Sequence, residues 1–143
     1  MSKQNVVDAQ FEEFIAMKCA TFANLKYVVT PDNTRYDFWL QTDKDILVLA
    51  EIKTRAKLFP DWFIEKDKSE WLLEACKLFR CAPWYVIHCE PNKTTYQINL
   101  NHEFKYRTGD MYGEPGIFVL REYWRIIPKL GSSDAPMSPL DWK

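Results

Sequence analysis

An apolar run that ends in alternating charges decides the fold of this chain: residues 47–55, LVLAEIKTR. Side chains two positions apart in a strand share a face, so Glu51 and Lys53 emerge side by side while Ile52 points the other way. Two leucines of the run lie on the same face as the charges, so this face is not a simple solvated surface. We therefore expect the pair to serve a site, because an ion pair on an exposed edge strand is worth less than about 1 kcal/mol.

The sequence around this strand predicts a single α/β domain. Helical spacing of apolar residues predicts helices over 8–22 and 66–80, and the first is amphipathic. Alternating or continuous apolar runs bounded by turn residues predict strands over 25–30, 35–41, 46–53, 84–89, 94–100 and 116–127, with a break near Pro60 and a loop over 107–115. The order through residue 89 is thus helix, three strands, helix, strand.

Length and composition limit the classes of protein that this chain can be. The 143 residues fit one domain, which we place at 1–130, followed by a flexible tail at 131–143 (GSSDAPMSPLDWK). The net charge of -1 excludes a histone-like basic field, so any nucleic-acid contact must use a local basic surface helped by metal ions.

Targeting and cofactor motifs are missing from the sequence. No apolar run approaches the roughly 20 residues of a membrane span, and the N-terminal residues lack the apolar core of a signal peptide, so we expect a cytoplasmic protein with reduced thiols. The four cysteines include no CxxC pair, which favours ordinary buried cysteines over a metal-thiolate site. Without G-x-G-x-x-G, G-x-x-x-x-G-K or G-x-S-x-G motifs, nucleotide-binding folds and serine hydrolases are not expected.

A second carboxylate, Asp37, is predicted on the strand that precedes the charged run. Neighbouring strands lie about 4.8 Å apart, so Asp37 and Glu51 converge if the strand register allows it. Two adjacent carboxylates repel each other unless a cation neutralises them, and hard oxygen ligands suit magnesium or manganese. Lys53 would position or help to deprotonate a water molecule and stabilise charge on a phosphate. Together these groups predict phosphodiester hydrolysis.

The element order with Asp37 and then Glu51-Ile52-Lys53 resembles the PD-(D/E)XK nuclease superfamily, over about residues 8–89. The resemblance implies a restriction-endonuclease-like αβββαβ core, with a mixed central sheet flanked by helices and extra C-terminal strands. It also implies that Asp37, Glu51 and the backbone carbonyl of Ile52 bind Mg²⁺ or Mn²⁺ and that Lys53 is the catalytic lysine.

Further site residues follow from the same resemblance. Glu12 matches the acidic residue that many members carry on the first helix, where it would be a catalytic residue and a metal ligand; Glu13 and a simple helix-surface role remain alternatives. Asp32, in the Pro31-Asp32 pair, is the lesser alternative to Asp37. The residues expected to contact nucleic acid are Lys68, its runner-up Lys66, and Arg55.

The resemblance implies a metal-dependent nuclease that cuts nucleic acid, DNA rather than RNA, and leaves a 5′-phosphate and a 3′-hydroxyl. In size the chain is similar to phage-encoded and Holliday-junction-resolving members, which are often homodimers. The alternative is a catalytically silent nuclease-like domain that binds nucleic acid or a protein. Such a domain could be a phage protein that binds a host partner through its aromatic surface and the SPLDW segment of its tail.

Overall fold

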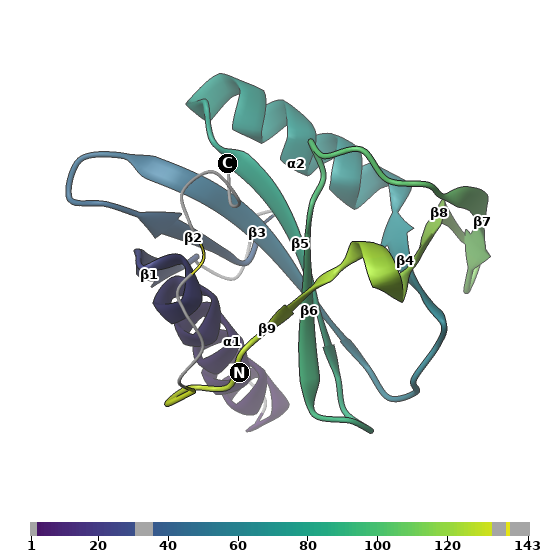
Figure 1. Cartoon of the computed structure of the whole chain (residues 1–143), viewed down its shortest axis with the longest axis horizontal. Coiled ribbons are helices and arrows are strands. Elements are labelled where there is room, and N and C mark those ends of the chain that lie inside the picture. Colours follow the sequence, from purple (N-terminus) through teal and green to yellow (C-terminus); the bar gives the residue numbers. More distant parts are fainter. Residues whose placement is uncertain (1–2, 31–35, 133–136, 138–143) are drawn as a thin grey trace.

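The computed structural model of the chain describes residues 3–30, 36–132 and 137, and the backbone alone for residues 3–9. A six-stranded sheet, in the order β1-β2-β3-β5-β6-β9, lies between two helices, and a three-stranded sheet in the order β4-β8-β7 stands beside it (Figure 1). The elements in chain order are α1 (Lys3–Ala23), β1 (Lys26–Val29), β2 (Phe38–Gln41), β3 (Ile46–Arg55), β4 (Asp61–Glu65), α2 (Lys66–Phe79), β5 (Ala82–Cys89), β6 (Thr94–Asn99), β7 (Arg107–Met111), β8 (Glu114–Leu120), the 3-10 helix η1 (Arg121–Tyr123) and β9 (Arg125–Ile127). The predicted α/β class, with a mixed central sheet, flanking helices and added C-terminal strands, is confirmed.

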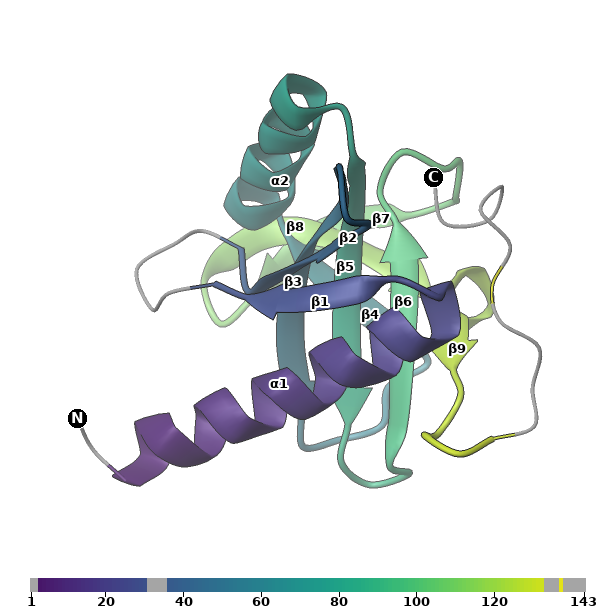
Figure 2. The ribbon, with the colours of Figure 1, turned by 90° about the vertical axis from the view of Figure 1, so that its left-hand side faces the viewer.

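Helix α1 covers one face of the large sheet (Figure 2). Its buried stripe includes Ile15 and Cys19, which pack in one cluster with Phe38, Ala50 and Val86 of the sheet. The helix stops at Asn24, whose positive φ of 57° lets the N–H of Leu25 return to the Ala20 carbonyl at 2.9 Å. The even-numbered residues of β3 therefore face α1.

The opposite face of the large sheet carries α2 and the small sheet. Leu49 packs with Leu72, Ala75 and Cys76, of which the last three belong to α2. Farther along, Tyr85 of β5 packs with residues of β4 and β8, among them Trp62 and Val119. The odd-numbered residues of β3, including both charges of the EIK triplet, point to this second face.

Strands β3 and β5 form the parallel pair of the sheet, with Glu51 opposite Tyr85. All eight residues of β5 are buried because helices or strands cover both faces, which explains why its sequence reads as a continuous apolar run. The parallel register places the charged end of β3 beside the middle of β5, where the small sheet comes close.

Three features differ from the sequence-based expectations. Strand β4 was not predicted, because its DWFIE run is short and buried and does not alternate. The expected loop over 107–115 contains β7 and the start of β8, which pair as a hairpin. The expected single strand over 116–127 is broken by η1, so β8 joins the small sheet and β9 the large one.

The proposed division at residue 130 falls near the end of the described chain. Residues 133–136 and 138–143, which make up most of the predicted tail, lie outside the described residues, as does Asp32. Met137 is buried against the α1 side of the core, and its N–H donates to the Phe22 carbonyl. Within the described residues, neither helix is both long enough and apolar enough to cross a membrane.

Candidate active site

Asp37 lies immediately before β2 rather than within a strand. Its N–H donates to the Ala50 carbonyl at 2.8 Å, so the backbone still follows β3. Its side-chain Oδ2 accepts the N–H of Ile52 at 2.6 Å. The carboxylate thus takes the place of a backbone acceptor just before β2 begins, which fixes Asp37 against the EIK triplet.

The backbone of Ile52 presents a further oxygen to this region. The N–H and C=O of one strand residue point to the same side of the strand. Since the N–H of Ile52 donates to Asp37, the Ile52 carbonyl also points to the side of β3 on which Asp37 and β2 lie. This orientation is compatible with the predicted role of the Ile52 carbonyl as a metal ligand, which stays a prediction.

Glu51 is the buried centre of a charged cluster. Only 4% of the residue is exposed. Its Oε1 lies 3.5 Å from the Nζ of Lys53 and 3.7 Å from the Nζ of Lys68, on the first turns of α2. The structure thus brings together Asp37, Glu51, Lys53 and Lys68, which are four of the residues selected from sequence.

The two carboxyl groups hold their protons more tightly than ordinary acids. Burial, followed by the charge of Asp37, raises the pKa of Glu51 to about 7, against the smaller opposing effect of Lys53 and Lys68. Burial also raises the pKa of Asp37, which the hydrogen bond from Ile52 and the two lysines partly offset. The site is therefore short of positive charge near neutral pH.

Glu65 is a site residue that the sequence reasoning missed. It ends β4 and precedes α2, and its Oε1 lies 3.7 Å from the Nζ of Lys53. Lys53 is thus held between Glu51 and Glu65. The sequence did contain a sign of this residue, because residues 61–65 (DWFIE), like residues 47–51 (LVLAE), place a glutamate directly after apolar residues.

Beneath these charges lies the hydroxyl group of Tyr85. It is fully buried and makes no hydrogen bond to another described residue. Burial and the neighbouring charges of Glu51 and Glu65 raise its pKa, while the backbone amide of Glu65 and, to a smaller extent, Arg55 act in the opposite direction. Arg55, predicted to contact nucleic acid, therefore lies near the site, at the end of β3 and on the same face as Lys53.

Two predicted residues occupy other places in the fold. Glu12 is half-buried on α1, which packs against the face of the sheet opposite to Glu51 and Lys53. Its alternative, Glu13, accepts a hydrogen bond from the Tyr27 hydroxyl at 3.1 Å. Lys66 is exposed and lines a pocket of about 660 Å³ between α2 and the β7–β8 hairpin, whereas Lys68 meets Glu51. Roles for Glu12 and Lys66 stay predictions.

The oxygen donors at Asp37 and Glu51 fit a hard divalent cation. Burial raises the pKa of both carboxyl groups, and the charge of Asp37 raises the pKa of Glu51 further; a bound cation would stabilise the ionised form of both. Within the described parts of the chain, no group of three or more His, Cys, Asp or Glu side chains is placed to hold a metal ion. Ligands beyond the two carboxylates would therefore be backbone oxygens or water, which magnesium commonly retains.

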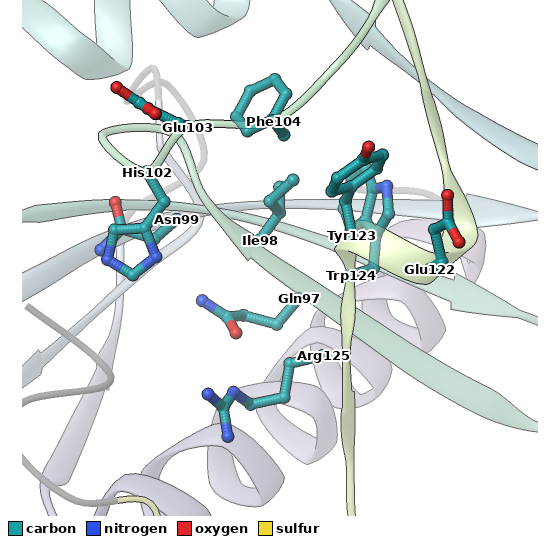
Figure 3. Close-up of a pocket in the computed structure, with 10 residues that line it drawn as sticks. All are labelled: Gln97, Ile98, Asn99, His102, Glu103, Phe104, Glu122, Tyr123, Trp124 and Arg125. Carbon is teal, nitrogen blue, oxygen red and sulfur yellow. The ribbon is translucent and has the colours of Figure 1, made fainter.

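A separate pocket of about 330 Å³ lies at the far edge of the large sheet. Residues of β6, of the following loop and of the segment from Glu122 to Arg125 line it, and the Gln97 and Arg125 side chains lie on one side of it (Figure 3). None of the described candidates for catalysis lines this pocket, so it is distinct from the carboxylate cluster.

Comparisons with known proteins show a likeness in structure alone. No protein-family model matches the sequence, and no curated protein matches it. The fold is similar to that of Hjc, a Holliday junction resolvase from Archaeoglobus fulgidus, with a TM-score of 0.56, 11% identity, and coverage of 80% of this chain and 88% of that one. A second similar structure is D212, a nuclease from a fusselovirus, at a TM-score of 0.49 and 12% identity over 86% and 83% of the two chains.

At such low identity the likeness to the resolvase establishes the fold and nothing further. It agrees with a mixed sheet that is flanked by helices. The fold that the resemblance implied is thus confirmed: the chain has a restriction-endonuclease-like α/β fold, similar to that of the resolvase.

Proposed function

We propose that the chain is a metal-dependent nuclease whose active site is the cluster around Asp37, Glu51 and Lys53. The observation that carries this proposal is a pair of carboxyl groups, the buried Glu51 and the half-buried Asp37, both with raised pKa, beside a lysine that contacts Glu51. Ion pairs that only stabilise a protein surface do not require burial, whereas acids with shifted pKa values beside a basic side chain are typical of catalytic sites.

Each residue of the cluster has a separate role in the proposed hydrolysis. Asp37 and Glu51, with the carbonyl of Ile52, would hold Mg²⁺ or Mn²⁺, which when bound supplies charge stabilisation for phosphodiester hydrolysis. Lys53, held between Glu51 and Glu65, is fixed in position to orient the attacking water. Lys68 is partly exposed at the rim of the cluster and is suited to contact a phosphate of the substrate.

The finer features of the proposal follow the resemblance. The substrate is DNA, cleavage leaves a 5′-phosphate and a 3′-hydroxyl, and the active form is a homodimer. Support comes from the likeness in fold to a protein described as a Holliday junction resolvase. The small size of the chain also favours recognition of nucleic-acid structure over recognition of a long sequence.

The decisive experiment is cleavage of a labelled panel: linear duplex, single strand, four-way junction and RNA. Each is incubated with magnesium, manganese or chelator, and the products are resolved on a gel that distinguishes the end groups. Asp37→Asn, Glu51→Gln and Lys53→Met should each lower the rate at least about a hundredfold, because each removes a group that acts on the reacting phosphate. Light scattering of the same samples gives the oligomeric state.

Matched controls separate catalysis from folding. Asp43→Asn changes an exposed aspartate of the β2–β3 turn, and Glu74→Gln changes an exposed glutamate of α2; both should retain full activity. If wild-type protein binds the metal in a calorimeter yet cuts no substrate, the nuclease proposal fails. The alternative of a silent domain that binds nucleic acid or a protein partner would then replace it.

A further inference from the structure

On the side of the large sheet opposite to the carboxylate cluster, a lysine of α1 is buried without a counter-ion among the residues that the structure describes. Lys18 is 4% exposed, and its Nζ donates to the hydroxyl of Thr95 at 2.9 Å. The same hydroxyl lies 2.9 Å from Nδ1 of His88. An ammonium group has three donors, so Thr95 satisfies one of them.

The charges around Lys18 do not neutralise it. Among the described residues, Lys18 forms no ion pair with a carboxylate, and neither does its neighbour Lys129. The Phe14 ring, 5.8 Å from the Nζ, offers a weak cation–π contact. Burial lowers the pKa of Lys18, and the positive charge of Lys129 lowers it further. Burying a cation without a counter-ion destabilises the folded protein unless an anionic ligand neutralises the charge.

A small pocket opens between these two lysines. It has a volume of about 120 Å³, and its lining consists of Lys18, Thr21, Phe22, Pro128, Lys129, Leu130, Gly131 and Ser132. That volume is about four times the ~30 Å³ that a water molecule occupies in the liquid, which is enough for a tetrahedral oxyanion. Among the described residues, the lining contains two cations and two hydroxyl-bearing residues, and it contains no acid.

We propose that this pocket is a binding site for a phosphate group or a similar tetrahedral oxyanion, held by Lys18 and Lys129. The anion would supply the counter-charge that Lys18 lacks and accept hydrogen bonds from its remaining donors. The ligand is either free inorganic phosphate or the terminal phosphate of a nucleic-acid strand, which share this chemistry. The site lies on the α1 face, so it does not depend on the proposed nuclease function.

Calorimetric titration with sodium phosphate tests the site, with sodium chloride at matched ionic strength as the reference. The protein is metal-free and carries Glu51→Gln, so that no substrate is cut. We expect one phosphate per chain, and a rise in melting temperature of about 4 °C at ten times the dissociation constant. Lys18→Met should weaken binding roughly ten- to a hundredfold, because a charged hydrogen-bond donor is lost.

Two further variants keep the test decisive. Lys129→Met alters the exposed lysine at the rim of the pocket, so it tests the site even if the buried substitution disturbs folding; it should weaken binding several-fold. Lys77→Met, an exposed lysine on α2, should leave binding unchanged. Equal stabilisation by phosphate and chloride, or phosphate binding that survives both pocket substitutions, would overturn the proposal.

The source of the phosphate is settled by a second pair of probes. A short single-stranded oligonucleotide with a 5′-phosphate is titrated beside the same oligonucleotide without it. Tighter binding of the phosphorylated strand that is lost in Lys18→Met supports the site and identifies a nucleic-acid end as ligand. Binding of inorganic phosphate alone, with the same dependence on Lys18, supports the site and identifies the free ion.

Discussion

At the scale of single residues, Glu51 dominates the behaviour of the metal-free protein. It is a buried acid beside a half-buried one, Asp37, and the two nearby lysines do not fully compensate for this environment. Its pKa rises from an ordinary value of 4.5 to about 7. Protonation and stability are therefore linked through this one side chain, and the proposed metal site would add metal binding to this linkage.

The stability of the metal-free protein should fall as the pH rises between about 4.5 and 7. The folded protein keeps the Glu51 proton that the unfolded chain releases in this window, so each step up in pH favours unfolding. We expect the free energy of unfolding to drop by about 1–3 kcal/mol from pH 5 to pH 8 in chelator. Denaturant unfolding at several pH values measures it, and Glu51→Gln should remove most of the slope.

Magnesium should reverse this trend, since a cation competes with the proton for the carboxylates. The rise in melting temperature that the metal causes should be larger at pH 8 than at pH 6. An identical metal effect in wild type and Glu51→Gln would show that the cation binds elsewhere.

The hydroxyl of Tyr85 should contribute nothing to stability. It is buried without a hydrogen bond to the described residues, so Tyr85→Phe removes an unsatisfied group and should leave the free energy of unfolding unchanged or slightly raised. Tyr96 is a matched control, because its hydroxyl accepts a hydrogen bond from Asn92 at 3.0 Å. Tyr96→Phe should cost about 0.5–1.5 kcal/mol. A larger loss for Tyr85→Phe than for Tyr96→Phe would contradict this account.

At the scale of elements, the contact between β4 and β8 positions Glu65. Gly116 pairs with Glu65 across these strands. A Cβ atom at Gly116 would lie 2.2 Å from the Ile64 carbonyl oxygen, so the two strands approach too closely for any side chain there.

Gly116→Ala should therefore separate β8 from β4 and disturb the glutamate that holds Lys53. We expect a loss of about 1–3 kcal/mol in the free energy of unfolding, together with weaker nuclease activity. The exposed Thr108 of β7 provides the control, and Thr108→Ala should stay within about 0.5 kcal/mol of wild type. A fully active Gly116→Ala protein would show that Glu65 is not needed at the site.

The end of α2 carries a strained residue. Arg80 has φ of 58° and ψ of 48°, the left-handed conformation that glycine adopts without cost, and its N–H caps the Cys76 carbonyl. Arg80→Gly should raise the free energy of unfolding by about 0.5–1 kcal/mol, as measured by denaturant titration. Lys77→Gly, inside the helix, should lower it by about 1 kcal/mol. Equal effects at both positions would rule out the cap as the cause.

The elements also show what the sequence could and could not reveal. Strand β3 has a clear alternation, so Glu51 and Lys53 were placed together on one face. Lys68 was proposed from the family resemblance, and the structure places it beside Glu51. Strand β4 has no alternation, because it is buried on both sides, and Glu65 was missed with it. The 116–127 run is uniformly β-forming, and only tertiary pairing reveals that its two ends belong to different sheets.

At the scale of the whole molecule, the large sheet separates two charged regions of opposite character. The acidic cluster faces α2, whereas Lys18 and Lys129 lie on the α1 side. The distance in sequence between Asp37 and Glu51, or between Lys18 and Lys129, gives no hint of this division. The alternation of β3 predicted the region around Glu51. The region around Lys18 could not be predicted in this way, because it depends on where the chain after β9 returns to α1.

The near-zero net charge predicts that electrostatic attraction contributes little to nucleic-acid binding, so that binding depends only weakly on salt concentration. With 19 basic and 20 acidic residues, only a few lysines near the site can neutralise phosphates. In chelator, a plot of the logarithm of the DNA association constant against the logarithm of salt concentration should fall with a slope of about 1–3. Fluorescence anisotropy at salt concentrations between about 50 and 200 mM measures this slope. A slope near that of proteins that neutralise six or more phosphates would contradict this prediction.

The pairing of β3 has a consequence for the order in which the molecule assembles. Its antiparallel partner, β2, is joined to it by a short turn, so Asp37 and Glu51 meet through a local hairpin. Its parallel partner is β5. This strand arrives only after β4 and α2, which carry Glu65 to Lys53 and Lys68 to Glu51. Local contacts form sooner than distant ones. The folding chain should therefore bring its two acids together before Lys68 reaches them, and a divalent cation that binds the hairpin early would raise the rate of folding as well as the stability of the product.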